Sequence, residues 1–201
     1  MNKIICIARQ YESGGSEIGK IVSQRLGVPF YDKEIINKIA KEHGISTEMI
    51  QNYDEKHTNS FLYSLSLGAF SNGEVINGLP DMPLSDKIYV AQDNLIKELA
   101  DKGPCVIIGR CANYILKDKY DIISVFVYAP AEFKVERLMR SKGYDRNTAL
   151  SEIRKMDKKR AAYNNYYSDL KWGEVKSYDL CINSSLGFEK CADIICAALE
   201  K

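Results

Sequence analysis

The sequence predicts a single α/β domain in which helices cover both faces of a central, mostly parallel β-sheet. Short apolar runs rich in β-branched residues alternate along the chain with longer segments of helical periodicity. The apolar runs are unbroken, which is typical of strands that are buried on both faces. The length of 201 residues suits one domain with a full hydrophobic core, so we treat 1–201 as a single unit.

The strands are predicted from apolar runs that are bounded by Gly, Pro, Asp or Asn. Four runs have this character: 4–8, 105–108, 122–128 and 180–182. The shorter segment 28–31 is a candidate for a fifth strand.

The helices are predicted from apolar residues that recur at helical spacing. In the first of them Ile18, Ile21, Val22 and Leu26 share one face, and Gly27 is a natural stop. A second such pattern begins after Ser85, which we expect to be an N-cap. The predicted helices are 17–26, 33–43, 86–102, 131–142, 146–166 and 188–199.

Two regions interrupt the alternation of strands and helices. Residues 56–84 are rich in Ser, Asn and Gly and contain two prolines, which predicts a flexible flap over the carboxyl edge of the sheet. Residues 134–160 hold ten Lys or Arg residues against four Asp or Glu, although the whole chain has a net charge of only +1. Any electrostatic function is therefore expected to depend on this local cluster of positive charge.

Composition excludes several classes of protein. The apolar start is too short for a signal peptide, and no run approaches the roughly 20 residues of a membrane span. The six cysteines form no C-x-x-C pair and only two histidines are present, so buried reduced thiols are favoured over disulfides or zinc. We expect a cytoplasmic protein with no nucleic-acid or membrane partner, and the sequence does not predict its oligomeric state.

The segment after the first strand, 9–20, combines a turn, the adjacent glycines Gly14 and Gly15, and the start of a helix. Backbone amides in such a turn, together with a helix N-terminus, form a cradle for anions. The alternative is that the glycines only make a tight turn. A phosphate-loop pattern ending at Gly19-Lys20 would put Ile21 where a hydroxyl belongs, whereas the better register places Gly15 at the usual lysine position.

Landmarks along nearly the whole chain resemble one family. They are Ile7-Ala8-Arg9 with the Ser13-Gly14-Gly15 turn and Ile18-Gly19-Lys20, followed by the segments 29–36, 106–110, 157–161 and 178–183. In their order they are similar to the cytidylate kinase-like group of P-loop nucleoside monophosphate kinases. This resemblance implies a P-loop NTPase-type three-layer sandwich with a helical lid at 142–170. It also implies ATP and Mg²⁺ as cofactors and a nucleoside monophosphate as the small-molecule substrate.

On the donor side, the resemblance implies that the loop cradles the phosphates of ATP. Arg9, at the mouth of the loop, is expected to act catalytically in place of the missing lysine. The residues expected to bind phosphate are Ser13, Gly14, Gly15, Ser16, Glu17 and Lys20. The metal ligands are not predicted.

On the acceptor side, Arg110 follows a strand end and is expected to grip the acceptor's phosphate, because an arginine fork binds phosphate oxygens in pairs. Asp32 is expected to contact the acceptor or a metal-bound water, or else to cap a helix. In the lid, Arg160 would stabilise the charge of the transition state, with Asp157 orienting it or reading the base. Arg137 and Arg140 would reach the phosphates, and Arg137 and Arg154 would bind the acceptor. Arg154, Asp157 and Arg160 recur at a spacing that puts them approximately on one face of the predicted helix. A solvated helix face is the alternative for any one of these charges.

Three positions depart from the family pattern. Gly15 occupies the position where the family has the loop lysine, and Ile108 occupies that of an aspartate. Glu12 is found where the family has a glycine at the start of the loop. Each lost charge is expected to slow phosphoryl transfer by roughly 10²–10³-fold unless it is compensated. Arg9 and Lys20 are the candidates to compensate.

The predicted function is therefore ATP-dependent phosphoryl transfer to a nucleoside monophosphate or a related small acceptor. The main alternative is a nucleotide- or phosphate-binding protein that has the kinase fold and no turnover. A third hypothesis, RNA binding by residues 134–160, lacks an RNA-binding fold signature and ranks last. The aromatic residues Tyr163, Tyr166, Tyr167 and Trp172 either stack on a base or pack the helix against its neighbours.

Overall fold

A computed structural model describes residues 3–32 and 84–199 of the chain. Within these ranges five parallel strands form one sheet in the order β2-β3-β1-β4-β5. The strands are β1 (Ile4–Arg9), β2 (Phe30–Tyr31), β3 (Val106–Ile108), β4 (Ile122–Tyr128) and β5 (Leu180–Asn183). The five predicted strands are confirmed, with ends that shift by two residues at most.

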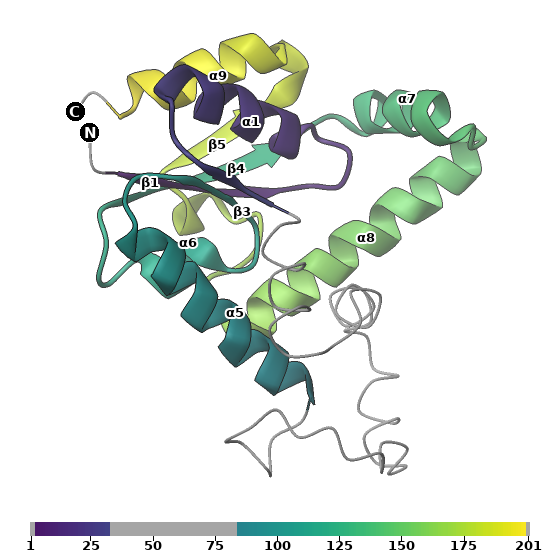
Figure 1. Cartoon of the computed structure of the whole chain (residues 1–201). Coiled ribbons are helices and arrows are strands. Elements are labelled where there is room, and N and C mark those ends of the chain that lie inside the picture. Colours follow the sequence, from purple (N-terminus) through teal and green to yellow (C-terminus); the bar gives the residue numbers. More distant parts are fainter. Residues whose placement is uncertain (1–2, 33–83, 200–201) are drawn as a thin grey trace.

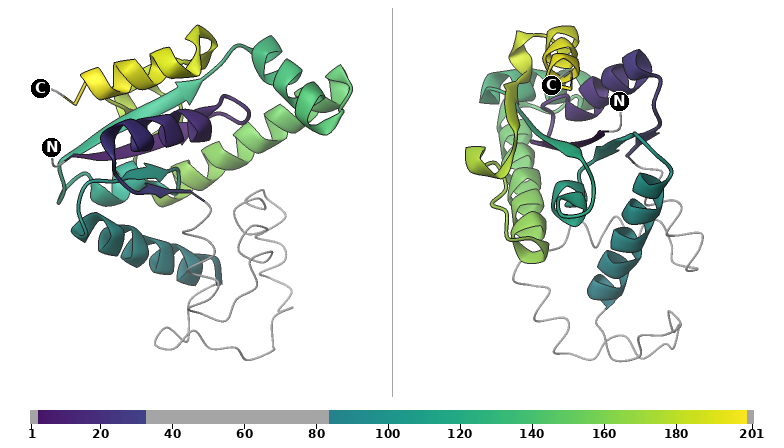
Figure 2. Two further views of the ribbon diagram at one scale, coloured as in Figure 1. Left: turned by 45° about the horizontal axis from the view of Figure 1, so that its top comes forward. Right: turned by 90° about the vertical axis from the view of Figure 1, so that its left-hand side faces the viewer.

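Helices cover both faces of the sheet, as predicted (Figures 1 and 2). On one face α1 (Gly15–Leu26) and α9 (Phe188–Ala197) pack against β1 through a core that includes Ile18, Ile195 and Ile7. On the other face α5 (Leu84–Asp101) and α6 (Ala112–Leu116) close a second core. Because β1 is the central strand and is buried on both sides, the segment that follows it is held firmly at the carboxyl edge of the sheet.

Two further helices form a hairpin beyond the carboxyl ends of the strands. The helix α7 (Ala131–Lys142) has Gly143 as its C-cap. The helix α8 (Arg146–Tyr167) has Asp145 as its N-cap, and the Asp145 carboxylate accepts hydrogen bonds from two amides of the first turn. Figure 1 shows α8 running past the strand ends toward α5. The hairpin has a small apolar core of its own, made by Val135, Leu138, Ala149 and Ile153.

The structure differs from some predicted boundaries. Helix α1 begins at Gly15, two residues earlier than predicted, because Gly14 adopts a left-handed φ of 79° and serves as the N-cap. Ser85 is not an N-cap, since α5 already begins at Leu84, and its hydroxyl donates to Asp86 instead. The predicted helix 33–43 and the predicted flap 56–84, apart from Leu84, lie outside the described residues.

The cysteines behave as the sequence predicts. All six are free, and Cys6, Cys105, Cys111 and Cys191 are buried. Burial raises the pKa of Cys105 to about 11. Among the helices of the described ranges, none is both long and apolar enough to cross a membrane.

Candidate functional site

The loop between β1 and α1 is fixed in place by a buried serine. Ser13 is fully buried, and its hydroxyl contacts two carbonyl oxygens, Gln10 O at 2.8 Å and Val127 O at 3.0 Å. The next residue, Gly14, accepts the first hydrogen bond of α1 from the amide of Ile18. The amides that precede Ile18 in the first turn have no acceptor within the helix, and together they carry partial positive charge. The loop therefore has the backbone geometry of an anion cradle.

Two positions in the loop have left-handed backbone. At Gly14 a Cβ atom would also lie 2.3 Å from the ring of Phe188, so only glycine fits there. Glu12 adopts a φ of 57° although it has a side chain. This left-handed conformation explains why glycine would suit position 12 and why glutamate is strained there.

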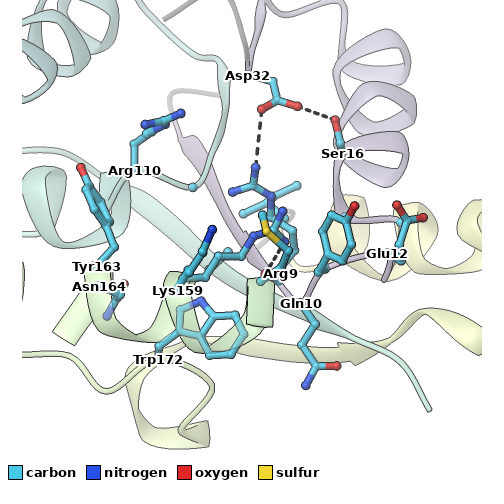
Figure 3. A pocket seen from close by; sticks show the side chains of 18 of the residues that line it. Arg9, Gln10, Glu12, Ser16, Asp32, Arg110, Lys159, Tyr163, Asn164 and Trp172 are labelled. Atoms are coloured by element: carbon cyan, nitrogen blue, oxygen red, sulfur yellow. Dashed lines mark hydrogen bonds and ion pairs between the residues drawn. The ribbon is translucent and has the colours of Figure 1, made fainter. Parts of the chain in front are cut away.

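Arg9 crosses the carboxyl edge of the sheet over two glycines. A Cβ atom at Gly15 would lie 2.6 Å from Arg9 Cβ, and a Cβ atom at Gly109 would lie 2.1 Å from Arg9 Nη1. The guanidinium reaches Asp32, with 3.6 Å between Nη2 and Oδ1. Ser16 donates to the other oxygen of the same carboxylate at 2.6 Å, as Figure 3 shows. The absence of side chains at Gly15 and Gly109 is thus what makes room for Arg9.

Arg110 sits in a strained turn at the end of β3. Gly109, Arg110 and Cys111 all have positive φ, between 56° and 72°, which is rare for residues with a side chain. Each such residue costs about 1–3 kcal/mol, so the rest of the structure holds Arg110 in a defined direction. The preceding residue, Ile108, is buried against α1, where Gly19 allows close approach. This apolar contact explains why no carboxylate stands at position 108.

One face of α8 closes the other side of the site. Met156, Lys159, Arg160, Tyr163 and Asn164 line a common cavity, and their spacing is that of a single helix face. Arg160 donates to Arg9 O at 3.1 Å and lies over the ring of Tyr11. Burial lowers the pKa of Arg160, and the nearby Arg110 acts in the same direction. Arg160 and Arg110 therefore contribute guanidinium groups to the wall of the same cavity.

Asp157 is not among the residues that line the cavity. Its carboxylate accepts the backbone amide of Tyr11 at 2.6 Å and the ammonium of Lys134 at 3.1 Å. Lys134 is buried and also donates to the side chain of Gln10 at 3.0 Å. Asp157 therefore ties the loop to both α7 and α8.

The remaining predicted residues divide into two groups. Arg137 and Glu17 line the cavity and pair with each other, and Arg137 also lies 3.4 Å from Glu12 and over the ring of Phe188. Lys20 and Arg154 are exposed and are not among the residues that line the cavity.

The cavity that these residues share measures about 620 Å³. Figure 3 shows Asp32 and Ser16 on one side of Arg9, and Lys159 and Trp172 on the other. Of the described residues that line it, five are Arg or Lys and three are Asp or Glu. The described ranges contain no group of three His, Cys, Asp or Glu residues that could hold a metal ion. The oxygens of Ser16 and Asp32 are the hard ligands that Mg²⁺ prefers when phosphates complete its shell.

The aromatic residues in the last turns of α8 and just after it have different roles. Tyr163 and Trp172 line the cavity, whereas Tyr167 stacks on Tyr89 with ring centroids 4.1 Å apart, and Tyr166 is exposed. The packing role is therefore confirmed for Tyr167, whereas stacking of Tyr163 or Trp172 on a base stays a prediction.

The sequence places Lys134 and Lys159 in the basic cluster 134–160 without predicting a role for either, and it does not predict a role for Asn113. Asn113 is buried, lines the cavity, and has an amide nitrogen with no hydrogen-bond partner in the part of the chain that the structure describes. The sequence signal that could have identified Asn113 as a cavity residue is its position three residues after Arg110, in the same segment that follows a strand end. Lys134 gave no signal, because a buried lysine on a helix looks like a surface lysine in sequence.

The sequence matches the family described as the cytidylate kinase-like family over residues 4–186. A cytidylate kinase from Methanococcus aeolicus is 34% identical over 91 residues, which cover 44% of this chain and 51% of that protein. The chain thus matches about half the length of this relative. A cytidylate kinase from Pyrococcus horikoshii is 25% identical over 185 residues, which cover 90% of this chain and 80% of that protein.

Solved structures show the same fold. An uncharacterized protein from Eubacterium ventriosum aligns with a TM-score of 0.74 and 28% identity, over 100% of this chain and 99% of that one. Shikimate kinase from Bacteroides thetaiotaomicron aligns with a TM-score of 0.60 and 14% identity over the whole of both chains. At that identity the second likeness concerns the fold alone, which is that of the P-loop kinases.

Proposed function

The chain belongs to the cytidylate kinase-like family, and from this premise we propose that it transfers the γ-phosphoryl group of ATP to a nucleoside monophosphate of the cytidylate type. In this reaction a phosphate oxygen of the acceptor forms a bond to the γ-phosphorus. The bond from that phosphorus to the bridging oxygen breaks, and ADP leaves. The protein contributes positions and charge rather than covalent chemistry.

One observation is the main support for the proposed kinase function. A cavity joins the amide cradle of the loop to cationic side chains from three separate elements: Arg9 from β1, Arg110 after β3, and Arg160 from α8. A phosphate chain carries several negative charges, and cations fixed before binding stabilise them without reorganisation.

On the donor side, the cradle at residues 13–16 would bind the phosphates of ATP and Arg9 would supply the charge that Gly15 lacks. Ser16 and Asp32 would hold Mg²⁺, which neutralises phosphate charge when it is bound. Arg9 pairs with one oxygen of Asp32. Binding of the metal nucleotide would therefore release Arg9 from Asp32 toward the phosphates.

On the acceptor side, Arg110 would bind the phosphate and Arg160 would approach from the lid helix. Asp157 would act indirectly, because it fixes the start of the loop at Tyr11 and holds α8 beside it. Arg137 would bind the nucleotide beside the loop, where it is already held by Glu12 and Glu17.

The second candidate function is nucleotide or phosphate binding without turnover. It is favoured by Gly15 and Ile108, which remove the usual lysine and carboxylate from the site. The two functions separate in one experiment that combines a panel of nucleoside monophosphates, ATP and Mg²⁺ with measurement of ADP, and calorimetry with ATP alone. Acceptor-dependent ADP supports the kinase, heat without ADP supports the binding protein, and neither signal contradicts both.

Removal of the guanidinium in Arg110→Ala is expected to raise the KM for the acceptor about 10- to 100-fold, as for loss of a hydrogen bond to a charged group. The KM for ATP should change much less. The control is Arg25→Ala, which removes the same charge from a residue that does not line the cavity. Arg25 instead pairs with Glu189 and Asp193 on α9. Equal acceptor KM values for the two variants would contradict the role of Arg110.

A further inference from the structure

Lys159 has no assigned role, yet it lies in the wall of the cavity. It is half-buried on α8, on the helix face that also carries Met156 and Tyr163. Figure 3 shows its ammonium pointing into the cavity, toward the space between Arg110 and Arg9. The adjacent lysine, Lys158, is exposed and is not among the lining residues.

The acidic side chains of the cavity are already paired with other cations. Asp32 pairs with Arg9, and both Glu12 and Glu17 pair with Arg137. Outside the cavity wall, Asp157 pairs with Lys134 in the same way. No carboxylate among the described lining residues is therefore left to neutralise a further cation.

Lys159 makes no hydrogen bond or ion pair with any residue in 3–32 or 84–199. A cavity-lining ammonium without a protein partner is stabilised by an anion that binds beside it, through a charge-assisted hydrogen bond. Lysine suits this task because its ammonium is a compact charge on a flexible stem that can follow a moving phosphate. The same cavity also contains the unpartnered amide nitrogen of Asn113, a second donor that the described residues leave unused.

We propose that Lys159 is a phosphate-binding residue of this site and that it brings an ammonium from α8 to the phosphoryl group in transfer, on the side of the cavity opposite the loop. The proposal rests on the function proposed above. In that arrangement the loop contributes amides and Arg9, while α8 contributes Lys159 together with Arg160. The positive charge that is absent at Gly15 is then distributed over two elements that flank the phosphates.

The test compares Lys159→Met with Lys158→Met, which removes the same charge one residue away on the exposed face. Calorimetry with Mg-ATP and with inorganic tripolyphosphate measures binding, and acceptor-dependent ADP release measures turnover. We expect Lys159→Met to weaken both ligands roughly 10- to 100-fold. Lys158→Met should bind like the wild-type protein. Lys159→Arg, which retains the charge, should recover most of the affinity.

Each outcome decides the proposal. Equal affinities of Lys159→Met and Lys158→Met, in variants with unchanged thermal unfolding, overturn it. So does a wild-type protein that binds neither ATP nor tripolyphosphate. If the wild-type protein binds ATP and releases no ADP with any acceptor, the kinase function fails. The two affinities still decide the role of Lys159 in that case.

Discussion

The variant Gly15→Lys is expected to lose nucleotide binding, although it introduces the lysine that phosphate loops usually carry at this position. The new Cβ would lie 2.6 Å from Arg9 Cβ and 3.0 Å from Arg9 Cγ. The backbone fixes the position of Arg9 Cβ, so no change of side-chain rotamer can relieve the 2.6 Å contact. We expect the loop to be displaced and the protein to lose about 1–3 kcal/mol of unfolding free energy, as for other overpacked sites.

The same geometry predicts a rescue. In the double variant Arg9→Gly/Gly15→Lys the clash is removed and one cation remains at the loop. We expect Mg-ATP affinity to recover to within about tenfold of the wild-type value, with part of the loss due to glycine at a strand end. Calorimetry on the wild-type protein, both single variants and the double variant measures this coupling. Wild-type affinity in Gly15→Lys alone would show that Arg9 does not occupy the space of the missing lysine.

Loss of the Asp157 carboxylate is expected to have the largest effect on stability. Asp157→Ala leaves Lys134 buried without its counter-ion and leaves the Tyr11 amide without its acceptor. Removal of one partner of a buried ion pair typically costs about 3–5 kcal/mol. We expect a loss of about 3 kcal/mol in urea unfolding, together with weaker ATP binding because the start of the loop is released.

Two comparison variants separate the causes of this loss. Asp157→Asn keeps an oxygen for Tyr11 and removes only the charge, so it should be milder than Asp157→Ala. Lys134→Met/Asp157→Ala removes both charges, so it should be more stable than Asp157→Ala alone. A loss below about 1 kcal/mol in Asp157→Ala would mean that water replaces the carboxylate at little cost.

Most of the fold could be predicted from the sequence because its signals are local. The strand at Ile122–Tyr128 is an unbroken apolar run, and its predicted ends agree with β4. The helix at Ala131–Lys142 is bounded by Pro130 and Gly143, which set its ends through backbone conformation alone. The start of α1 was less predictable, because Gly14 caps the helix without a side chain that could signal it.

The site was predicted only where its chemistry is local to one segment. The glycine turn and Arg110 follow strand ends, and the structure places both in the wall of the cavity. The pairing of Arg9 with Asp32 joins segments far apart in sequence and depends on the order of strands in the sheet. Arg154 was grouped with Arg160, but six residues along a helix rotate a side chain by about 240°, so the two face different directions.

The direction of the parallel strands has a practical consequence for use of the protein as a sensor. Strand β1 begins, and α9 ends, at the edge of the sheet away from the cavity (Figure 1). Fluorescent reporters or a surface tether joined near these points would not obstruct entry of small molecules.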